Sequence, residues 1–361
     1  ILKLLDVAAS TGVAVPFVRE VTGVVFMTLV PGTFALLQFD YGDRSLATTV
    51  CYAFGLSLVA VMAVGATLSL TLPLVGIERP LSLDVLLLTG VCLSVLAAWR
   101  ADGQVRCPVD TAWLTHPYTP GLLLLAPVSV LGSVHYHVTG TNTVLLGLLV
   151  AIAAVPVAVA VAGSERWYLP LAVWSLSLAL LYHGRVPGTY TVTQPLPQLT
   201  MATLRWIPNA GSYGSLLPNG VLYPVYAIVT GLPIGLEWNL VNPVLVSVLP
   251  VTLYEVFRRQ IAPRQAFVAV CLFVFAYPFY VLYPGAGRAA TPVMFIALVG
   301  LAYSDDALPT VPRELLLMLF GGGIVVSHYG TAYVVLFALV VGSVSFAVLR
   351  GLVWIDLPAR L

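Results

Sequence analysis

The sequence predicts an all-α fold, a polytopic transmembrane helical bundle of about 11 spans. Of the 361 residues, 60% are hydrophobic and only 9% are charged, and the mean hydropathy is +0.99. Soluble domains carry about 25% charged residues, so this chain has too few charges to cover a surface in water. Lipid is therefore its solvent, which excludes cytosolic enzymes, nucleic-acid binders and disulfide-stapled secreted domains. The net charge of +1 also indicates no nucleic-acid partner.

Apolar runs long enough to cross a bilayer follow one another along most of the chain. The expected spans cover residues 20–38, 46–75, 81–99, 120–138, 143–162, 167–183, 238–257, 265–284, 289–304, 314–327 and 329–349. They divide the chain into three parts. Residues 1–183 form an N-terminal set of transmembrane helices, 184–237 a loop with interfacial or re-entrant helices, and 238–361 a C-terminal set.

The segment 216–233 is the ambiguous one, because it is apolar but interrupted by Pro218, Pro224 and Pro233. Each proline removes a backbone donor, and unsatisfied backbone groups are costly in lipid. If the segment does not span, most arginines fall on one side of the membrane, as the positive-inside rule requires. We therefore expect a multi-pass protein of the cell membrane with loop 184–237 on the external side.

Few residues are candidates for chemistry. Loop 184–237 offers neutral hydrogen-bonding and aromatic groups together with one cation, of which we single out Tyr190, Gln194 and Arg205. No Asp or Glu occurs between Arg166 and Leu236. General-base or metal-assisted chemistry there would need a carboxylate or a well-placed histidine, and the nearest include Glu237 and His328.

Three further features allow a structural or a functional reading. Arg288 follows an expected external turn and could clamp a phosphate or extend to lipid headgroups. His328 and Tyr329 lie in a polar turn that either packs on the loop or faces a ligand. Glu255, one turn before Arg258, is interpreted as part of an interfacial charge cluster. We expect no metal and no cofactor, since the chain has no Cys-x-x-Cys and no Cys/His cluster.

Several segments form a pattern by their order and spacing: 16–32, 55–57, 76–82, 175–183, 242–260 and 327–331. Together they resemble an archaeal family of large membrane proteins of unknown function, which is itself similar to the GT-C class of membrane glycosyltransferases. The resemblance implies sugar transfer from a polyprenyl-phosphate carrier at the outer face. It also implies an acidic loop residue that acts as base or binds metal, and a cation that meets the lipid phosphate.

The chain departs from this pattern at the positions that matter for catalysis. Tyr190 stands where the resemblance implies an aspartate, and Gln194 where it implies a further acid. Arg288 is kept, but Ala289 and Ala290 follow it in place of polar or acidic residues. The GT-C-like scaffold is thus expected without its catalytic carboxylates.

We therefore expect a non-catalytic GT-C-like scaffold that anchors or presents a cell-surface component or binds a lipid headgroup. The alternative is a glycosyltransferase that uses a polyprenyl-phosphate donor. A transporter or flippase is disfavoured by the scarcity of charges within the spans and by the absence of an internal repeat. The expected partners are membrane lipids, with a polyprenyl-phosphate sugar and other cell-envelope proteins as further candidates.

Overall fold

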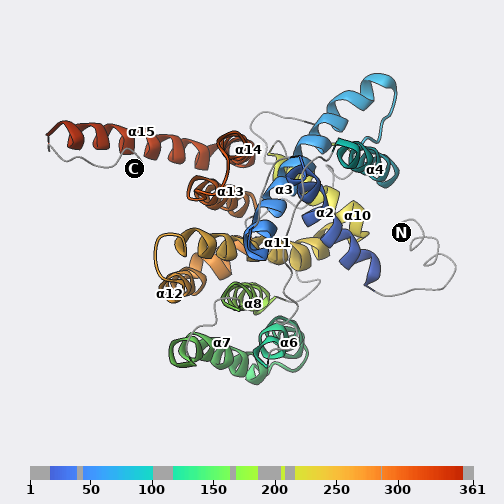
Figure 1. The fold of residues 1–361 in the computed structure, drawn as a ribbon. Coiled ribbons are helices and arrows are strands. Elements are labelled where there is room, and N and C mark those ends of the chain that lie inside the picture. Colours follow the sequence, from blue (N-terminus) through green and yellow to red (C-terminus); the bar gives the residue numbers. More distant parts are fainter. Residues whose placement is uncertain are drawn as a thin grey trace.

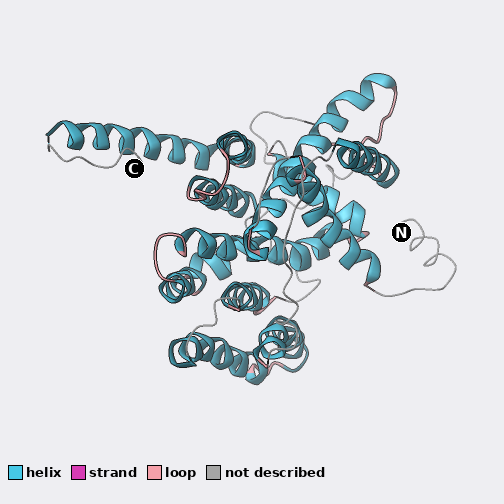
Figure 2. Cartoon of the chain, in the orientation of Figure 1, coloured by secondary structure: helices cyan, strands magenta, loops and turns pink. Residues whose placement is uncertain are grey.

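The computed structural model describes residues 17–38, 44–100, 117–162, 168–185, 205–207, 216–285 and 287–352. Every regular element in these ranges is a helix (Figure 2). The N-terminal set comprises α2 (Val18–Leu36), α3 (Leu46–Thr71), η1 (Leu72–Val75), α4 (Leu83–Arg100), α6 (Tyr118–Thr139), α7 (Thr143–Ala162) and α8 (Leu169–Tyr182). Then follow η3 (Pro218–Leu222), α10 (Tyr223–Thr230), α11 (Ile234–Phe257), α12 (Pro263–Val274), η4 (Pro278–Leu282), η5 (Tyr283–Gly285), α13 (Gly287–Tyr303), α14 (Thr310–Ser327) and α15 (Tyr329–Leu352).

Eight of these helices are long and apolar enough to cross a membrane, so the chain is a multi-pass membrane protein. They are α2, α3 with η1, α4, α6, α7, α11, α14 and α15. Three shorter apolar helices, α8, α12 and α13, lie where spans are also expected. The helix expected over 265–284 is wrong in its second half. It ends at Val274 and continues as a π-turn and a 3-10 turn that contain Pro278 and Pro284, because each proline lacks the amide donor of a regular helix.

The helix α11 lies in the middle of the bundle, with other helices on both of its sides. Figure 1 shows α8 between α11 and the α6/α7 pair, with α13 and α14 beyond the opposite side of α11. The helices α2, α3 and α10 gather beside α11, whereas α15 extends away from the other helices. Small residues allow the closest approaches. Gly32 of α2 lies directly against the backbone of Ala53 in α3, and Gly323 of α14 faces the ring of Phe295 in α13.

The segment 216–233 packs inside the bundle. Residues 218–227 are all buried, and Val221 packs against Gly65 of α3. The helix α10 has eight residues and is about 12 Å long, against about 30 Å of hydrocarbon, so it is too short to cross a bilayer by itself. It ends at Gly231, whose φ of 76° is a left-handed conformation that glycine adopts without strain. We call residues 216–233 the inserted segment.

Two ends of the bundle carry polar groups, and we name each by one arginine. At the Arg258 end, the end of α11 meets the start of α3 through Arg258 and Ser45. At the Arg185 end, the end of α8 meets the start of α11 through Arg185 and Asn239. The start of α13 also lies near that end, because Asn242 of α11 donates to the Pro284 carbonyl.

Candidate functional site

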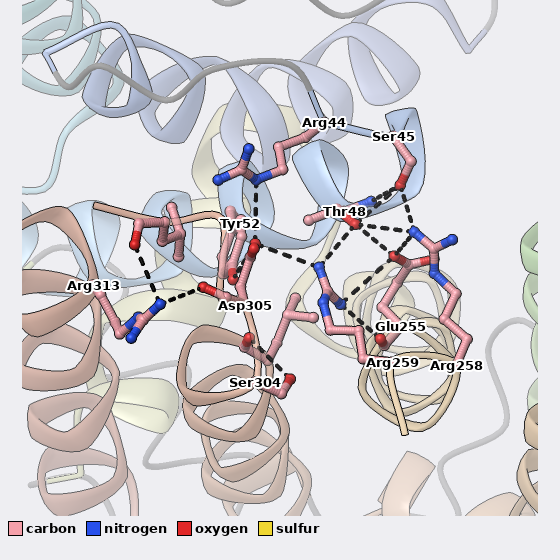
Figure 3. A network of polar contacts seen from close by, with 12 residues as sticks. Arg44, Ser45, Thr48, Tyr52, Glu255, Arg258, Arg259, Ser304, Asp305 and Arg313 are labelled. Carbon is pink, nitrogen blue, oxygen red and sulfur yellow. Dashed lines mark hydrogen bonds and ion pairs between the residues drawn. The ribbon is translucent and has the colours of Figure 1, made fainter. Parts of the chain in front are cut away.

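The Arg258 end contains a dense polar network, which we call the arginine–carboxylate cluster (Figure 3). It joins the start of α3, the end of α11 and the loop between α13 and α14. Its members are Arg44, Ser45, Thr48, Tyr52, Glu255, Arg258, Arg259, Asp305 and Arg313.

Glu255 is the centre of one half of the cluster. Its side chain is completely buried, and its Oε2 lies 2.6 Å from Nη2 of Arg258 and 3.9 Å from Nη1 of Arg259. Residues three and four apart share one face of a helix, which is why both arginines reach the same carboxylate. The hydroxyl of Thr48 on α3 also donates to this oxygen, so Glu255 connects α11 to α3.

Asp305 is the centre of the other half. Its Oδ2 lies 3.3 Å from Nε of Arg44 and 3.4 Å from Nη2 of Arg259, and the Tyr52 hydroxyl donates to it at 3.3 Å. Arg313 donates to the backbone carbonyl of Asp305 at 2.9 Å and so fixes the loop. Arg259 contacts both carboxylates, and the two halves therefore form one unit.

Both carboxylates of the cluster are compensated by arginines. Removing one partner of a buried ion pair destabilises a protein by about 3–5 kcal/mol, because the other charge is left buried and alone. The arrangement fits a structural connection between α3, α11 and the α13–α14 loop. The interfacial cluster expected around Glu255 is thus larger than the sequence suggested, and Arg44, Tyr52 and Asp305 belong to it.

The Arg185 end contains a cation in a different environment. The helix α8 ends at Tyr182. Two residues further on, Gly184 has a φ of 74° and donates its amide to the Ser133 hydroxyl of α6 at 2.9 Å. The Tyr182 hydroxyl donates to the Leu240 carbonyl of α11 at 2.6 Å. These two bonds hold the end of α8 between α6 and α11. As a result Arg185 projects beside Asn239.

Arg185 is partly buried and meets a neutral partner. Its Nη1 lies 3.5 Å from the Asn239 amide oxygen, and no carboxylate pairs with it among the described residues. Burial lowers the pKa of Arg185 to about 10, so the guanidinium still carries its charge at neutral pH. The neighbouring His183 has a buried Nε2 without a hydrogen-bond partner among the described residues. This end therefore offers the charged guanidinium of Arg185 to an incoming group.

Neutral side chains form a small hydrogen-bond network near the Arg185 end. The Tyr223 hydroxyl of α10 lies 3.2 Å from the Asn242 amide oxygen of α11 and 3.3 Å from the Thr291 hydroxyl of α13. The Asn242 amide donates to the Pro284 carbonyl at 2.9 Å. The cavity beside these groups has a volume of about 10 Å³, which is room for about one water molecule. A ligand larger than water therefore has to bind outside this cavity.

Glu237 lies in the first turn of α11 and is completely buried. Neither of its oxygens has a hydrogen-bond partner among the described residues. It lies within electrostatic range of the Tyr223 and Tyr226 hydroxyls on the inserted segment. The carboxylate nearest in sequence to the acid-free loop is thus enclosed by the fold.

The sequence-predicted site residues fall in different places. Arg288 lies in the first turn of α13, one turn before Thr291, which puts its backbone near the Arg185 end. His328 directly precedes α15, and its Nδ1 accepts from the Thr331 amide at 3.1 Å, while its ring stacks on Tyr329 with centroids 5.4 Å apart. This is the contact of a residue that caps the start of a helix, so His328 has a structural role at the start of α15.

The loop candidates are described only in part. Arg205 is exposed, and the adjacent Trp206 amide donates to the Ser69 hydroxyl of α3 at 3.2 Å. Tyr190 and Gln194 lie outside the described residues. The structure therefore ties the loop to α3 at Trp206 but does not test its two neutral candidates.

Sequence reasoning missed two features of these sites. Asp305 was not considered, although it lies in a short loop between two spans at the end where the arginines gather. Arg185 was treated only as a topology signal, because its burial against α11 depends on how α8 ends. The absence of acids from the following loop was the available signal for an uncompensated cation.

Comparison of the chain with protein-family models, with curated proteins and with solved structures found no match.

Proposed function

We propose that this protein is a GT-C-like membrane scaffold that binds the anionic headgroup of a lipid at its Arg185 end without transferring sugar itself. The observation that carries the proposal is the environment of Arg185. A partly buried guanidinium whose described partner is a neutral amide oxygen at 3.5 Å attracts an anion. The loop that follows cannot supply one, because residues 186–236 contain no Asp or Glu.

A phosphate group fits this environment best. Arginine offers a planar fork of donors that matches a phosphate, and lipid phosphates lie at the depth where transmembrane helices end. Arg185 meets Asn239 in the second turn of α11, near the amino-terminal end of that helix, and the positive end of the helix dipole adds attraction for an anion. Lipid-linked phosphates, with or without a sugar, are therefore the proposed ligand class.

The proposal places the Arg185 end on the external side of the cell membrane. Arg44, Arg258, Arg259 and Arg313 all lie at the Arg258 end, and an excess of arginine is typical of the cytoplasmic side. Loop 184–237 is then external. An external lipid-linked saccharide would meet Arg185 first, with Arg288 and Arg205 as further cations on the same side.

Measuring lipid binding tests the proposal. The purified protein in nanodiscs would be titrated with a polyprenyl phosphate, and with the unphosphorylated polyprenol as the tail-only control. We expect Arg185→Ala to weaken binding of the phosphate roughly 10- to 100-fold, since a hydrogen bond to a charged group contributes about 1.5–3 kcal/mol. Arg185→Lys keeps the charge but not the fork, and should bind with intermediate affinity.

The matched control is Arg264→Ala, which removes an exposed arginine at the start of α12. It should leave the affinity unchanged. Equal binding by the wild type and Arg185→Ala would overturn the proposed site. Equal binding of phosphate and polyprenol would show that only the tail is recognised.

A glycosyltransferase is the second candidate, and the position of Glu237 favours it. This carboxylate belongs to the Arg185 end and would be available as a general base if the inserted segment moved. Incubation with a lipid-phosphate sugar and an acceptor decides between the candidates. Sugar transfer or hydrolysis that is lost in Glu237→Gln or Arg288→Ala would replace the scaffold with an enzyme.

A further inference from the structure

The burial of Glu237 poses a physical problem that lipid-headgroup binding does not solve. Its side chain is 0% exposed, and neither carboxylate oxygen meets a donor or a cation among the described residues. Transferring an isolated carboxylate into a medium of low dielectric constant costs far more than the stability of a folded protein. Something must therefore neutralise this side chain.

The arginines nearest in the fold do not supply the charge. Arg19 of α2 donates to the carbonyls of Ile228 and Val229, and Arg185 faces Asn239. Neither of them forms an ion pair with Glu237. The titratable side chains of α10 within electrostatic range of Glu237 are Tyr223 and Tyr226, and both hydroxyls are neutral at physiological pH.

Other oxygens of the inserted segment are also buried. The amide oxygen of Asn219 is buried without a hydrogen-bond partner in the part of the chain that the structure describes, and Asn219 lies one turn before Tyr223. The Tyr226 hydroxyl is completely buried. Buried polar atoms almost always have a partner, and an unpaired one often indicates a water molecule or an ion. A carboxylate, an amide oxygen and hydroxyl oxygens are the ligands that a hard cation prefers.

The backbone here has the form found at ion sites in membranes. The inserted segment begins with the five-residue π-helix η3, continues as α10 and breaks at Gly231 before α11 starts. π-Turns are frequent at functional sites, and discontinuous helices form the coupling-ion sites of many transporters.

We propose that Glu237 is the charged ligand of a monovalent-cation site beneath the inserted segment, occupied by a proton or by a sodium ion. Either occupant removes the uncompensated charge. This site is distinct from the headgroup site at Arg185 and does not depend on it. Occupancy would stabilise the packing of α10 against α11.

The test is the thermal unfolding temperature of the full chain in detergent, for the wild type and for Glu237→Gln. The amide is a neutral isostere of the carboxylic acid. In one arm sodium replaces choline at constant ionic strength and pH, and in the other the pH rises without sodium. A sodium site predicts that sodium raises the midpoint of the wild type but not of Glu237→Gln. A proton site predicts that the midpoint of the wild type falls as the pH rises, because the proton is lost, while that of Glu237→Gln stays flat.

Two further variants complete the experiment. Glu314→Gln removes an exposed carboxylate at the start of α14 and should respond as the wild type does. Glu237→Asp serves as the test variant if Glu237→Gln does not fold. It keeps the carboxylate on a shorter side chain and should retain a weaker response to sodium or pH. The proposal is overturned if the wild type responds to neither sodium nor pH, if Glu237→Gln responds as strongly as the wild type to both, or if Glu237→Asp loses the response although it folds.

Discussion

The contact between α2 and α3 depends on one glycine, and replacing it with alanine should destabilise the protein. A Cβ at Gly32 would lie 1.7 Å from the carbonyl oxygen of Ala53 and 2.6 Å from its carbonyl carbon. Real Cβ contacts are essentially never shorter than 3.0 Å, so α2 and α3 have to move apart. The obstacle is backbone rather than the end of a flexible side chain, and no change of rotamer relieves it.

The magnitude follows from three contributions. Overpacking costs about 1–3 kcal/mol, with a backbone clash at the upper end. Separating the helices also lengthens the 2.8 Å bond from the Gly32 amide to the Ser57 hydroxyl, a loss of about 1 kcal/mol. The higher helix propensity of alanine returns about 1 kcal/mol. We expect Gly32→Ala to lower the free energy of unfolding by about 3 kcal/mol.

The assay is unfolding in mixed micelles with an increasing fraction of SDS, followed by circular dichroism. The matched control is Gly147→Ala in α7, where a Cβ would have no atom within 4 Å. It should be neutral or up to about 1 kcal/mol more stable, because only the propensity changes. The reasoning fails if Gly32→Ala is as stable as the wild type, or if both variants lose the same stability.

Three other predictions follow from the polar groups. Glu255→Gln should lower the free energy of unfolding by about 2–4 kcal/mol in the same assay. The control Glu314→Gln should change it by less than about 0.5 kcal/mol. Equal effects of the two substitutions would contradict the structural role of the arginine–carboxylate cluster. Asn242→Leu leaves the Pro284 carbonyl without its donor and should cost about 1–3 kcal/mol, and an unchanged midpoint would refute the importance of this bond. Cysteines introduced at Thr141 and Gln260 should react with a membrane-impermeant thiol reagent from opposite sides of the membrane, the first from outside; labelling from one side would overturn the proposed topology.

The positions of most helices could be predicted from the sequence. Apolar runs such as 46–75 and 143–162 coincide with α3 plus η1 and with α7 to within a residue. This works because the length of an apolar run and the thickness of a bilayer are both local quantities. The end of α12 was mispredicted, because hydropathy does not register the break that precedes Pro278.

The sites were less predictable than the helices. Arg44 and Asp305 are 261 residues apart in the chain, and their contact depends on how α3, α11, α13 and α14 pack. Hydropathy gives the same weight to a charge at the bilayer surface and to one enclosed between helices. For that reason the sequence did not indicate that Glu255 is completely buried where α11 meets α3.

The sequence by itself determined that this is a multi-pass, all-helical membrane protein with a long acid-free segment after α8. These properties depend on the amino-acid composition and on the lengths of the apolar runs in the sequence. Only the tertiary structure decided which charges are compensated. Asp305 is paired with Arg44 and Arg259, which lie far from it in the chain. Arg185 faces an amide, and Glu237 is enclosed without a hydrogen-bond partner among the described residues. In a medium of low dielectric constant the energy of a charge depends on its neighbours within a few ångströms, and those neighbours are chosen by helix packing.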